Sequence, residues 1–297
     1  MTINEMNKMP NQEKKFLEII TEARKHLEKK EFNNARLKYF NAMNHTTART
    51  NIGIVWAELS WVYYYEKDYH KAIEAAENVL LQDSTYFALD DLYRVQGFAY
   101  LALGEVALAE RYLQLSLEKN HDDDKQQYVK YELGKLNFAK GNYDQAHPLF
   151  VELEAFFQRF NPEYYLSILF YLGFIYYYLN NISRSEEYFK RLLSVEGVSA
   201  HWAASARFGL AFIEFRNKNH LNVIALCEEI LNFNPEFFDK ESLGFLTAAS
   251  YFYLGRKDIF NAYYEKLSET YPRGRYAQEM ENLYQSVADS DADTSDI

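Results

Sequence analysis

The chain has 297 residues and a formal net charge of −11, with 48% apolar and 25% charged residues. This balance is typical of a folded domain or a repeat array. The acidic charge argues against nucleic acid, for which a basic surface dominates affinity, and against attachment to anionic lipid. Aromatic residues reach 17%, whereas there are only 11 glycines and 5 prolines. Few turn formers favour helices over a many-stranded sheet.

Cysteine usage and the terminal sequence indicate the compartment. Cys227 is the only cysteine, so no internal disulfide can form, which fits a reducing environment. Residues 1–15 contain no apolar run of the kind a secretory signal needs. Residues 164–183 carry no charge and are long enough to span a bilayer, but the turn formers at Asn180-Asn181 favour a buried helix and its turn. We expect a cytoplasmic protein without membrane insertion.

A short phrase recurs along the chain: an aromatic or apolar residue, two variable residues, and a small residue that opens a helix. It reads FNNA at residues 32–35, YHKA at 69–72, VALA at 106–109 and YDQA at 143–146, and three weaker copies follow. Consecutive copies lie 37 to 39 residues apart, a register that chance would not maintain. The last residues of the seven copies are Ala35, Ala72, Ala109, Ala146, Ser185, Val223 and Phe260.

A second marker lies twelve residues before each of these positions, and it is always a small residue that lets another helix pack closely. Its members are Ala23, Ser60, Gly97, Gly134, Gly173, Ala211 and Ala248. Between the two markers stand the turn formers Gly104, Gly141, Asn180-Asn181 and Gly255. Such residues favour the left-handed conformation at the end of a helix. Each unit is therefore predicted to be helix A, a tight turn and helix B.

This pattern resembles the tetratricopeptide repeat family over about residues 13–273. The family's helix A aromatic is matched by Tyr63, Tyr100, Tyr176 and Tyr251, and its closing proline by Pro235 and Pro272. The resemblance implies an all-α, right-handed superhelical solenoid of about seven helix–turn–helix repeats. The usual period is about 34 residues, so we expect longer helices here. The helix A aromatic is replaced at His26, Asn137 and Glu214.

The termini depart from the repeat. Residues 1–12 are expected to form a flexible N-terminus, and residues 13–288 the solenoid domain. After the last closing proline, residues 275–287 read as an amphipathic helix that caps the solenoid. Residues 289–297 are short and acidic, and we expect a disordered tail there.

In the resembled family, outward positions of the A helices line a concave groove that binds peptides. Here the matching positions are rich in aromatic side chains, which dominate interface hot spots. The candidate groove residues are Trp61, Tyr64, Tyr65, Arg94, Phe98, Tyr131, Lys135, Phe138, Phe170, Tyr171, Phe174, Tyr178, Phe208 and Phe212. The resemblance implies an apolar peptide or amphipathic helix in this groove. The alternative is that a tight superhelical pitch buries these rings against each other.

The family's best-known groove holds a C-terminal carboxylate with lysine and asparagine clamps, and this chain lacks them. The matching positions are Ile20, Arg24, Glu58, Asp91 and Val95. One arginine among apolar and acidic residues does not make that clamp.

No motif for chemistry is present. The phosphate loop, GxGxxG and HExxH are absent, and the seven histidines show no ligand spacing. Cys227 lies two helical turns from His220, roughly 10 Å, too far for a nucleophile and its base. The run at residues 122–124 is expected to be a solvated acidic loop, and Pro148 either starts helix B or kinks it. We expect no catalytic residue, cofactor or metal.

The sequence therefore favours a non-enzymatic scaffold or adaptor that binds a protein or peptide partner in an aromatic groove. A structural protein that assembles with its own copies is the alternative, because solenoid ends and aromatic faces can stack. A further alternative is a peptide-responsive regulator, since bacterial regulators of this kind share the repeat class.

Overall fold

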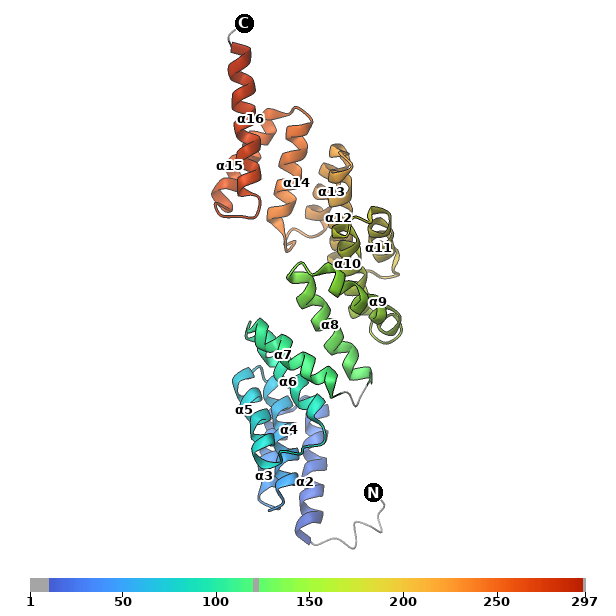
Figure 1. Ribbon diagram of the computed structural model, residues 1–297, viewed down its shortest axis with the longest axis vertical. Coiled ribbons are helices and arrows are strands. Elements are labelled where there is room, and N and C mark those ends of the chain that lie inside the picture. Colours follow the sequence, from blue (N-terminus) through green and yellow to red (C-terminus); the bar gives the residue numbers. More distant parts are fainter. Residues whose placement is uncertain (1–10, 120–122, 296–297) are drawn as a thin grey trace. The chain divides into compact units, whose positions relative to one another are not determined.

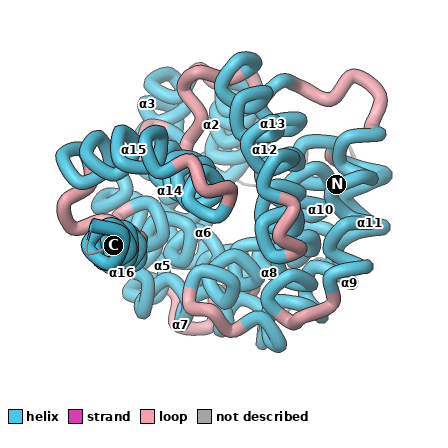
Figure 2. Tube along the Cα trace, turned by 90° about the horizontal axis from the view of Figure 1, so that it is seen from above, coloured by secondary structure: helices cyan, strands magenta, loops and turns pink. Residues whose placement is uncertain are grey.

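The computed structural model describes residues 11–119 and 123–295, and this part of the chain contains helices and loops but no strand (Figure 2). From α2 to α7 and from α9 to α16, helices that follow each other in sequence pack against each other, and alternate helices also touch, as between α4 and α6. The chain divides into two compact units, Met1–Leu136 and Asn137–Ile297. Helix α8, Asp123–Ala139, crosses the border between them.

Unit 1 contains three helical hairpins and most of α8 (Figure 1). The hairpin helices are α2 (Asn11–Glu28), α3 (Phe32–Met43), α4 (Arg49–Tyr65), α5 (Tyr69–Gln82), α6 (Leu89–Ala102) and α7 (Val106–Glu118). Their core includes Phe16, Tyr39 and Leu59, all essentially inaccessible to solvent.

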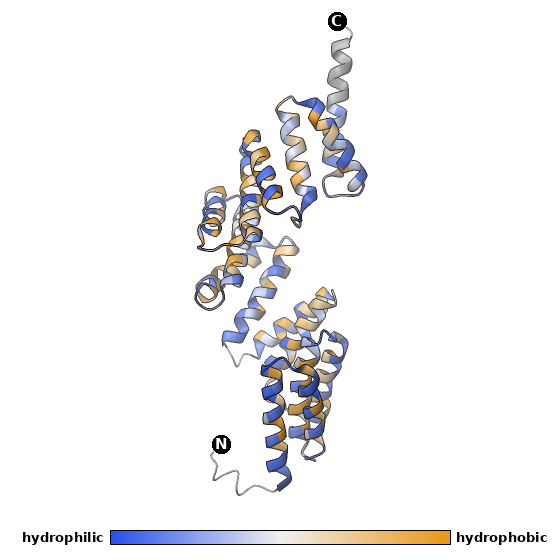
Figure 3. Ribbon diagram, turned by 180° about the vertical axis from the view of Figure 1, so that it is seen from behind, coloured by the Kyte–Doolittle hydropathy of each residue, from blue (hydrophilic) through white to orange (hydrophobic). Residues whose placement is uncertain are grey.

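Unit 2 contains the end of α8 and the remaining helices. They are α9 (Tyr143–Phe160), α10 (Pro162–Tyr178), α11 (Ile182–Ser194), α12 (Ala200–Arg216), α13 (His220–Phe233), α14 (Lys240–Tyr253), α15 (Lys257–Thr270) and α16 (Ala277–Ser295). Phe174, Phe189 and Cys227 belong to one buried cluster. Apolar and polar stretches alternate along the helices of both units, as expected for helices that bury one side (Figure 3).

Every turn between an A helix and its B helix in the described chain has a residue in the left-handed region. Turn formers were expected at four of these turns, and the positive φ of Gly104, Gly141, Asn180 and Gly255 confirms them. The other three turns place a lysine there, with φ of about 60°; these lysines are Lys30, Lys67 and Lys218. The next amide closes each turn on the carbonyl five residues back. Asp68 N donates to Tyr63 O at 2.9 Å, for example. This is the Schellman arrangement, which satisfies two carbonyls of the helix end.

Both small-residue markers lie where helices approach closely. Ala35, Ala72 and Ala109 of the first marker are fully buried, and so is the larger Phe260. In the second marker, a Cβ at Gly173 of α10 would lie 2.6 Å from the Phe189 ring of α11. Gly209 of α12 approaches the same ring, at 2.1 Å from its built Cβ. Phe189 is thus wedged between two helix backbones.

Three local features differ from, or refine, the expectation. Pro148 lies inside α9, beyond its first turn, so its missing amide leaves one carbonyl without the usual helical donor. Helix α16 runs to Ser295, past the expected end of the cap at 287 and through most of the stretch expected to be disordered. Of the acidic run, Asp122 is outside the described residues, and α8 begins at Asp123.

Candidate functional site

Unit 1 carries a packed group of rings on its A helices. Trp61 and Tyr64 of α4 both contact Phe98 of α6, with ring centroids 6.4 and 6.3 Å apart. Tyr65 lies 5.9 Å from Trp61 and stacks on Phe32 of α3 at 5.8 Å. Tyr65 is 50% exposed, whereas the other predicted groove rings of this group are half-buried. The rings therefore bury much of each other and leave one open.

Charged side chains frame this group. The indole of Trp61 donates to Asp91 at 2.8 Å, and Arg94 pairs with Asp91 and lies 4.9 Å above the Trp61 ring. Outside this group, the predicted groove residue Lys135 of α8 pairs with Glu132 at 2.9 Å. These cations are already matched by carboxylates, so they have little free charge for a ligand.

Tyr131 of α8 is buried at 8% exposure. It was predicted to line the groove, and the structure places it in the interior instead, with the ammonium of Lys135 lying 5.3 Å from its ring centroid. Its ring therefore offers a ligand little contact surface.

Unit 2 carries a larger group of touching rings, which we call the unit 2 aromatic face. Its members come from the last turn of α8, from α10, from α12 and from the loop before α14. They are Phe138, Phe170, Tyr171, Phe174, Tyr177, Tyr178, Phe208, Phe212 and Phe238. The contacts cross from helix to helix: Phe138 lies 5.0 Å from Tyr171, and Phe174 lies 5.9 Å from both Phe208 and Phe212.

The face has a buried floor and two open rings. Phe174 and Phe208 are only 5% and 4% exposed, so these predicted groove residues belong to the core. Tyr178 and Phe238 are 47% and 60% exposed. Phe238 rests on Phe170 and Phe208 at 6.5 and 5.9 Å. Mutual burial thus explains some of the aromatic excess, but leaves large apolar area open at these two rings.

Tyr178 and Phe238 mark two separate places on the face. Tyr178 stacks on Tyr143 of α9 at 4.4 Å and lies 6.2 Å from Phe138. Partial burial, with the neighbouring tyrosines, raises the pKa of Tyr178 to about 12. Its hydroxyl therefore stays protonated at neutral pH and can donate as well as accept. Phe170, under Phe238, is eight residues from Tyr178 on the same helix, or about 12 Å along its axis.

The repeat pattern does not predict Phe238 as a groove residue, because Phe238 lies in a loop and the pattern assigns only A-helix positions to the groove. A usable signal was present in the chain. Tyr86-Phe87 stands at the same place in the loop after α5, and there too the first ring is buried and the second exposed. The shared pair of aromatic residues in two equivalent loops was readable from the sequence.

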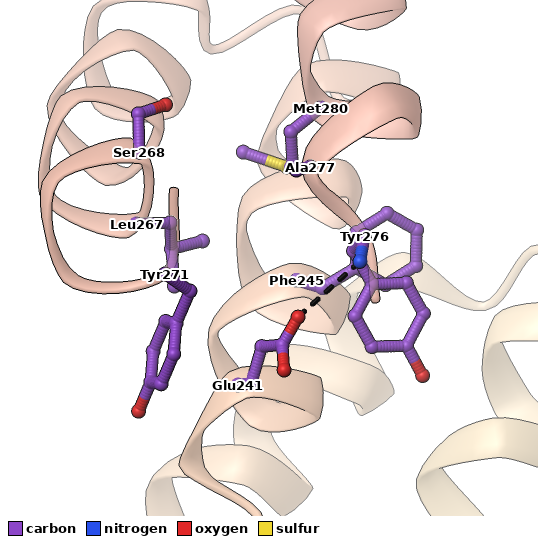
Figure 4. Close-up of a pocket in the computed structure, with 8 residues that line it drawn as sticks. All are labelled: Glu241, Phe245, Leu267, Ser268, Tyr271, Tyr276, Ala277 and Met280. Carbon is purple, nitrogen blue, oxygen red and sulfur yellow. Dashed lines mark hydrogen bonds between the residues drawn. The ribbon is translucent and has the colours of Figure 1, made fainter. Parts of the chain in front are cut away.

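A crevice in unit 2 lies under the last helix, between α14, α15 and α16 (Figure 4). Glu241 accepts a hydrogen bond from the backbone amide of Tyr276 at 3.2 Å, and the Tyr276 ring stacks on Phe245 at 4.1 Å. Arg275 pairs with Asp239 at 2.6 Å. These contacts fasten α16 to the preceding hairpin, and the crevice has room for only about one water molecule.

Groups suited to chemistry are not gathered in the described residues. No cluster of three or more potential metal-ligating side chains occurs among them. Cys227 is 1% exposed, and burial raises the pKa of its thiol to about 11, so it is not poised as a nucleophile. None of the described helices is long and apolar enough to span a bilayer.

Comparisons with known proteins bear on the fold. No family model and no curated sequence matches the chain. The structure of PilF from Pseudomonas aeruginosa is similar, with 14% identity, a TM-score of 0.56, and coverage of 79% of this chain and 98% of that one. A tetratricopeptide repeat protein from Parabacteroides merdae has 16% identity and a TM-score of 0.54, covering 91% and 97% of the two chains.

A third similar structure is that of PilW, described as a type IV pilus biogenesis factor, with 16% identity and a TM-score of 0.55. It covers 77% of this chain and 97% of its own. At such identities the likeness is one of fold. The described part of the chain has the tetratricopeptide repeat fold, as the sequence predicted.

Proposed function

We propose that this chain, with its tetratricopeptide repeat fold, is a scaffold that binds a polypeptide across the unit 2 aromatic face. The observation that carries the proposal is the pair of open rings, Tyr178 and Phe238, on a floor of buried ones. A repeat fold by itself does not specify a function, so the proposal depends on this surface.

Buried rings make the open ones effective for binding. Phe174 and Phe208 are fixed in the core, so the rings above them lose little freedom when a ligand arrives. Aromatic anchors of this kind often contribute 2 kcal/mol or more each to an interface. An apolar side chain that covers Phe238 also removes water from the half-buried Phe170 beneath it.

The test removes the two open rings. Tyr178→Ala and Phe238→Ala should each weaken partner binding by about thirtyfold, which corresponds to about 2 kcal/mol, and the double variant should weaken it by more. The fold should persist, because both side chains are at least 47% exposed. Affinity capture from the source organism, quantified by mass spectrometry, would identify proteins that the wild type retains and the double variant loses.

Phe233→Ala is the matched control. Phe233 is 64% exposed, lies at the end of helix B α13, and loses the same atoms as Phe238 on mutation. A partner lost equally by both variants, or retained by both, would contradict the proposal. Sedimentation at several concentrations adds a further outcome: self-association abolished by the double variant would show that a second copy covers the face.

A further inference from the structure

Arg216 differs from its neighbours in having no counter-charge. It ends α12, its guanidinium donates to the side chain of Asn180, and it lies 5.8 Å from the centroid of the Tyr177 ring. No carboxylate pairs with it among the residues that the structure describes. Its side chain is exposed.

The other arginines of α11 and α12 are all paired. Arg191 pairs with Glu154, and Arg207 lies 2.9 Å from Glu229. Arg184 lies 3.2 Å from Glu187. In a chain with a net charge of −11, carboxylates are abundant, yet none of the described ones pairs with Arg216.

The position of Arg216 has a partial structural explanation. A cation is favourable at the C-terminal end of a helix, and Asn180 and Tyr177 hold the guanidinium in place. Neither of these neighbours carries negative charge. The arrangement therefore leaves a positioned cation directly beside the unit 2 aromatic face, with donors free for an anionic group.

We propose that the polypeptide bound by this face carries an acidic side chain next to its apolar anchors, and that Arg216 pairs with it. This inference rests on the proposed function and specifies its partner. The guanidinium can hold a carboxylate with two parallel hydrogen bonds, which gives orientation as well as affinity. A polypeptide that covers the aromatic rings beside Arg216 would shield the pair from water and so strengthen it.

The probe is a displayed library of random peptides, fused at both ends so that no chain-terminal carboxylate is free. Peptides selected on the wild type should combine apolar residues with Asp or Glu, and Arg216→Gln should weaken them about tenfold. Selection on Arg216→Glu should instead enrich Lys and Arg. Arg184→Glu is the control, because it changes the net charge equally on α11, where the arginine is already paired.

The outcomes separate the two proposals. Suppose selected peptides lose binding on Tyr178→Ala with Phe238→Ala but show no acidic preference and bind Arg216→Gln equally. The charge inference then fails while the proposed function stands. If no peptide depends on the two rings, the proposed function fails.

Two other outcomes concern the charge alone. If Arg216→Glu and Arg184→Glu weaken peptide binding equally, the effect comes from long-range charge, which would overturn the role of Arg216. A second library with free C-termini that alone yields binders would assign the anion to the chain end and also overturn it.

Discussion

The wedge formed by Phe189 gives the sharpest test of the packing. Replacing Gly209 by alanine puts a Cβ 2.1, 2.3 and 2.4 Å from three carbons of the Phe189 ring. Carbon atoms in contact normally lie about 3.5–4.0 Å apart. The ring has little room to retreat, because Gly173 of α10 also approaches it, with a built Cβ 2.6 Å from Cε1.

Two effects of opposite sign set the magnitude. Alanine is better than glycine inside a helix by about 1 kcal/mol. Overpacking a rigid core costs about 1–3 kcal/mol, and a clash with a ring that two helix backbones already approach closely belongs at the upper end of that range. Gly209→Ala should therefore lower the free energy of unfolding of unit 2 by about 2 kcal/mol. Gly53→Ala should do the reverse, because its built Cβ meets no atom closer than 3.6 Å. It should stabilise α4 by up to about 1 kcal/mol.

Local probes are needed because a repeat array can unfold in parts. The thiol of Cys227 lies in the same buried cluster as Phe189, so its labelling rate across a urea series reports the opening of unit 2. Hydrogen exchange of the α4 amides reports Gly53→Ala. Adding Phe189→Leu to Gly209→Ala should restore part of the lost free energy of unfolding. The double-mutant cycle should then give an interaction energy above about 0.5 kcal/mol between the two positions. A neutral or stabilising Gly209→Ala, or a destabilising Gly53→Ala, would refute the packing argument.

Three further predictions concern turns, pH and the thiol. Lys67 and Gly104 both have φ between about +60° and +80°, a conformation that glycine adopts more easily than any other residue. Lys67→Gly should therefore raise the free energy of unfolding by about 0.5–1 kcal/mol, and Gly104→Ala should lower it by about 1 kcal/mol. Urea titrations of both variants would show whether the two signs differ. Tyr178 and Tyr188 have pKa values raised by burial to about 12, above the ordinary value of about 10. Because the folded state holds these two protons more tightly than the unfolded state, the stability they contribute should be complete below pH 10 and lost as the pH rises to about 12. Melting temperatures that stay constant over that range would contradict this prediction. Cys227 should resist an aromatic disulfide reagent at pH 8 in the folded protein and react at once in urea; rapid reaction of the native chain would show that its environment is open.

The repeat architecture could be predicted because its signals are periodic. Small residues at a fixed helical register predict close helix packing, and the structure confirms it at Ala35 and Gly173. The turns were predicted where the chain places glycine or asparagine. The turns at Lys30, Lys67 and Lys218 were found only through the register, because lysine has no preference for the left-handed region.

The site could be predicted only in outline. Helical register assigns a residue to a face, but it does not reveal how deeply neighbouring repeats cover that face. Phe174 and Tyr178 share a helix and a predicted role, yet one is 5% and the other 47% exposed. The close approach of Gly209 to Phe189 was also invisible, since it joins two hairpins and depends on their packing angle.

The seven turns of the described hairpins share their geometry without sharing their residues. Lysine, asparagine and glycine all occupy the left-handed position, and the same pair of backbone hydrogen bonds closes every turn. The reversal of the chain therefore depends on these backbone hydrogen bonds and on the length of the repeat, and not on one residue type at the turn. A natural or engineered rearrangement that joins two of these turns, and so removes or adds one whole hairpin, leaves every remaining helix end capped as before. The turns are thus natural crossover points for changing the number of repeats.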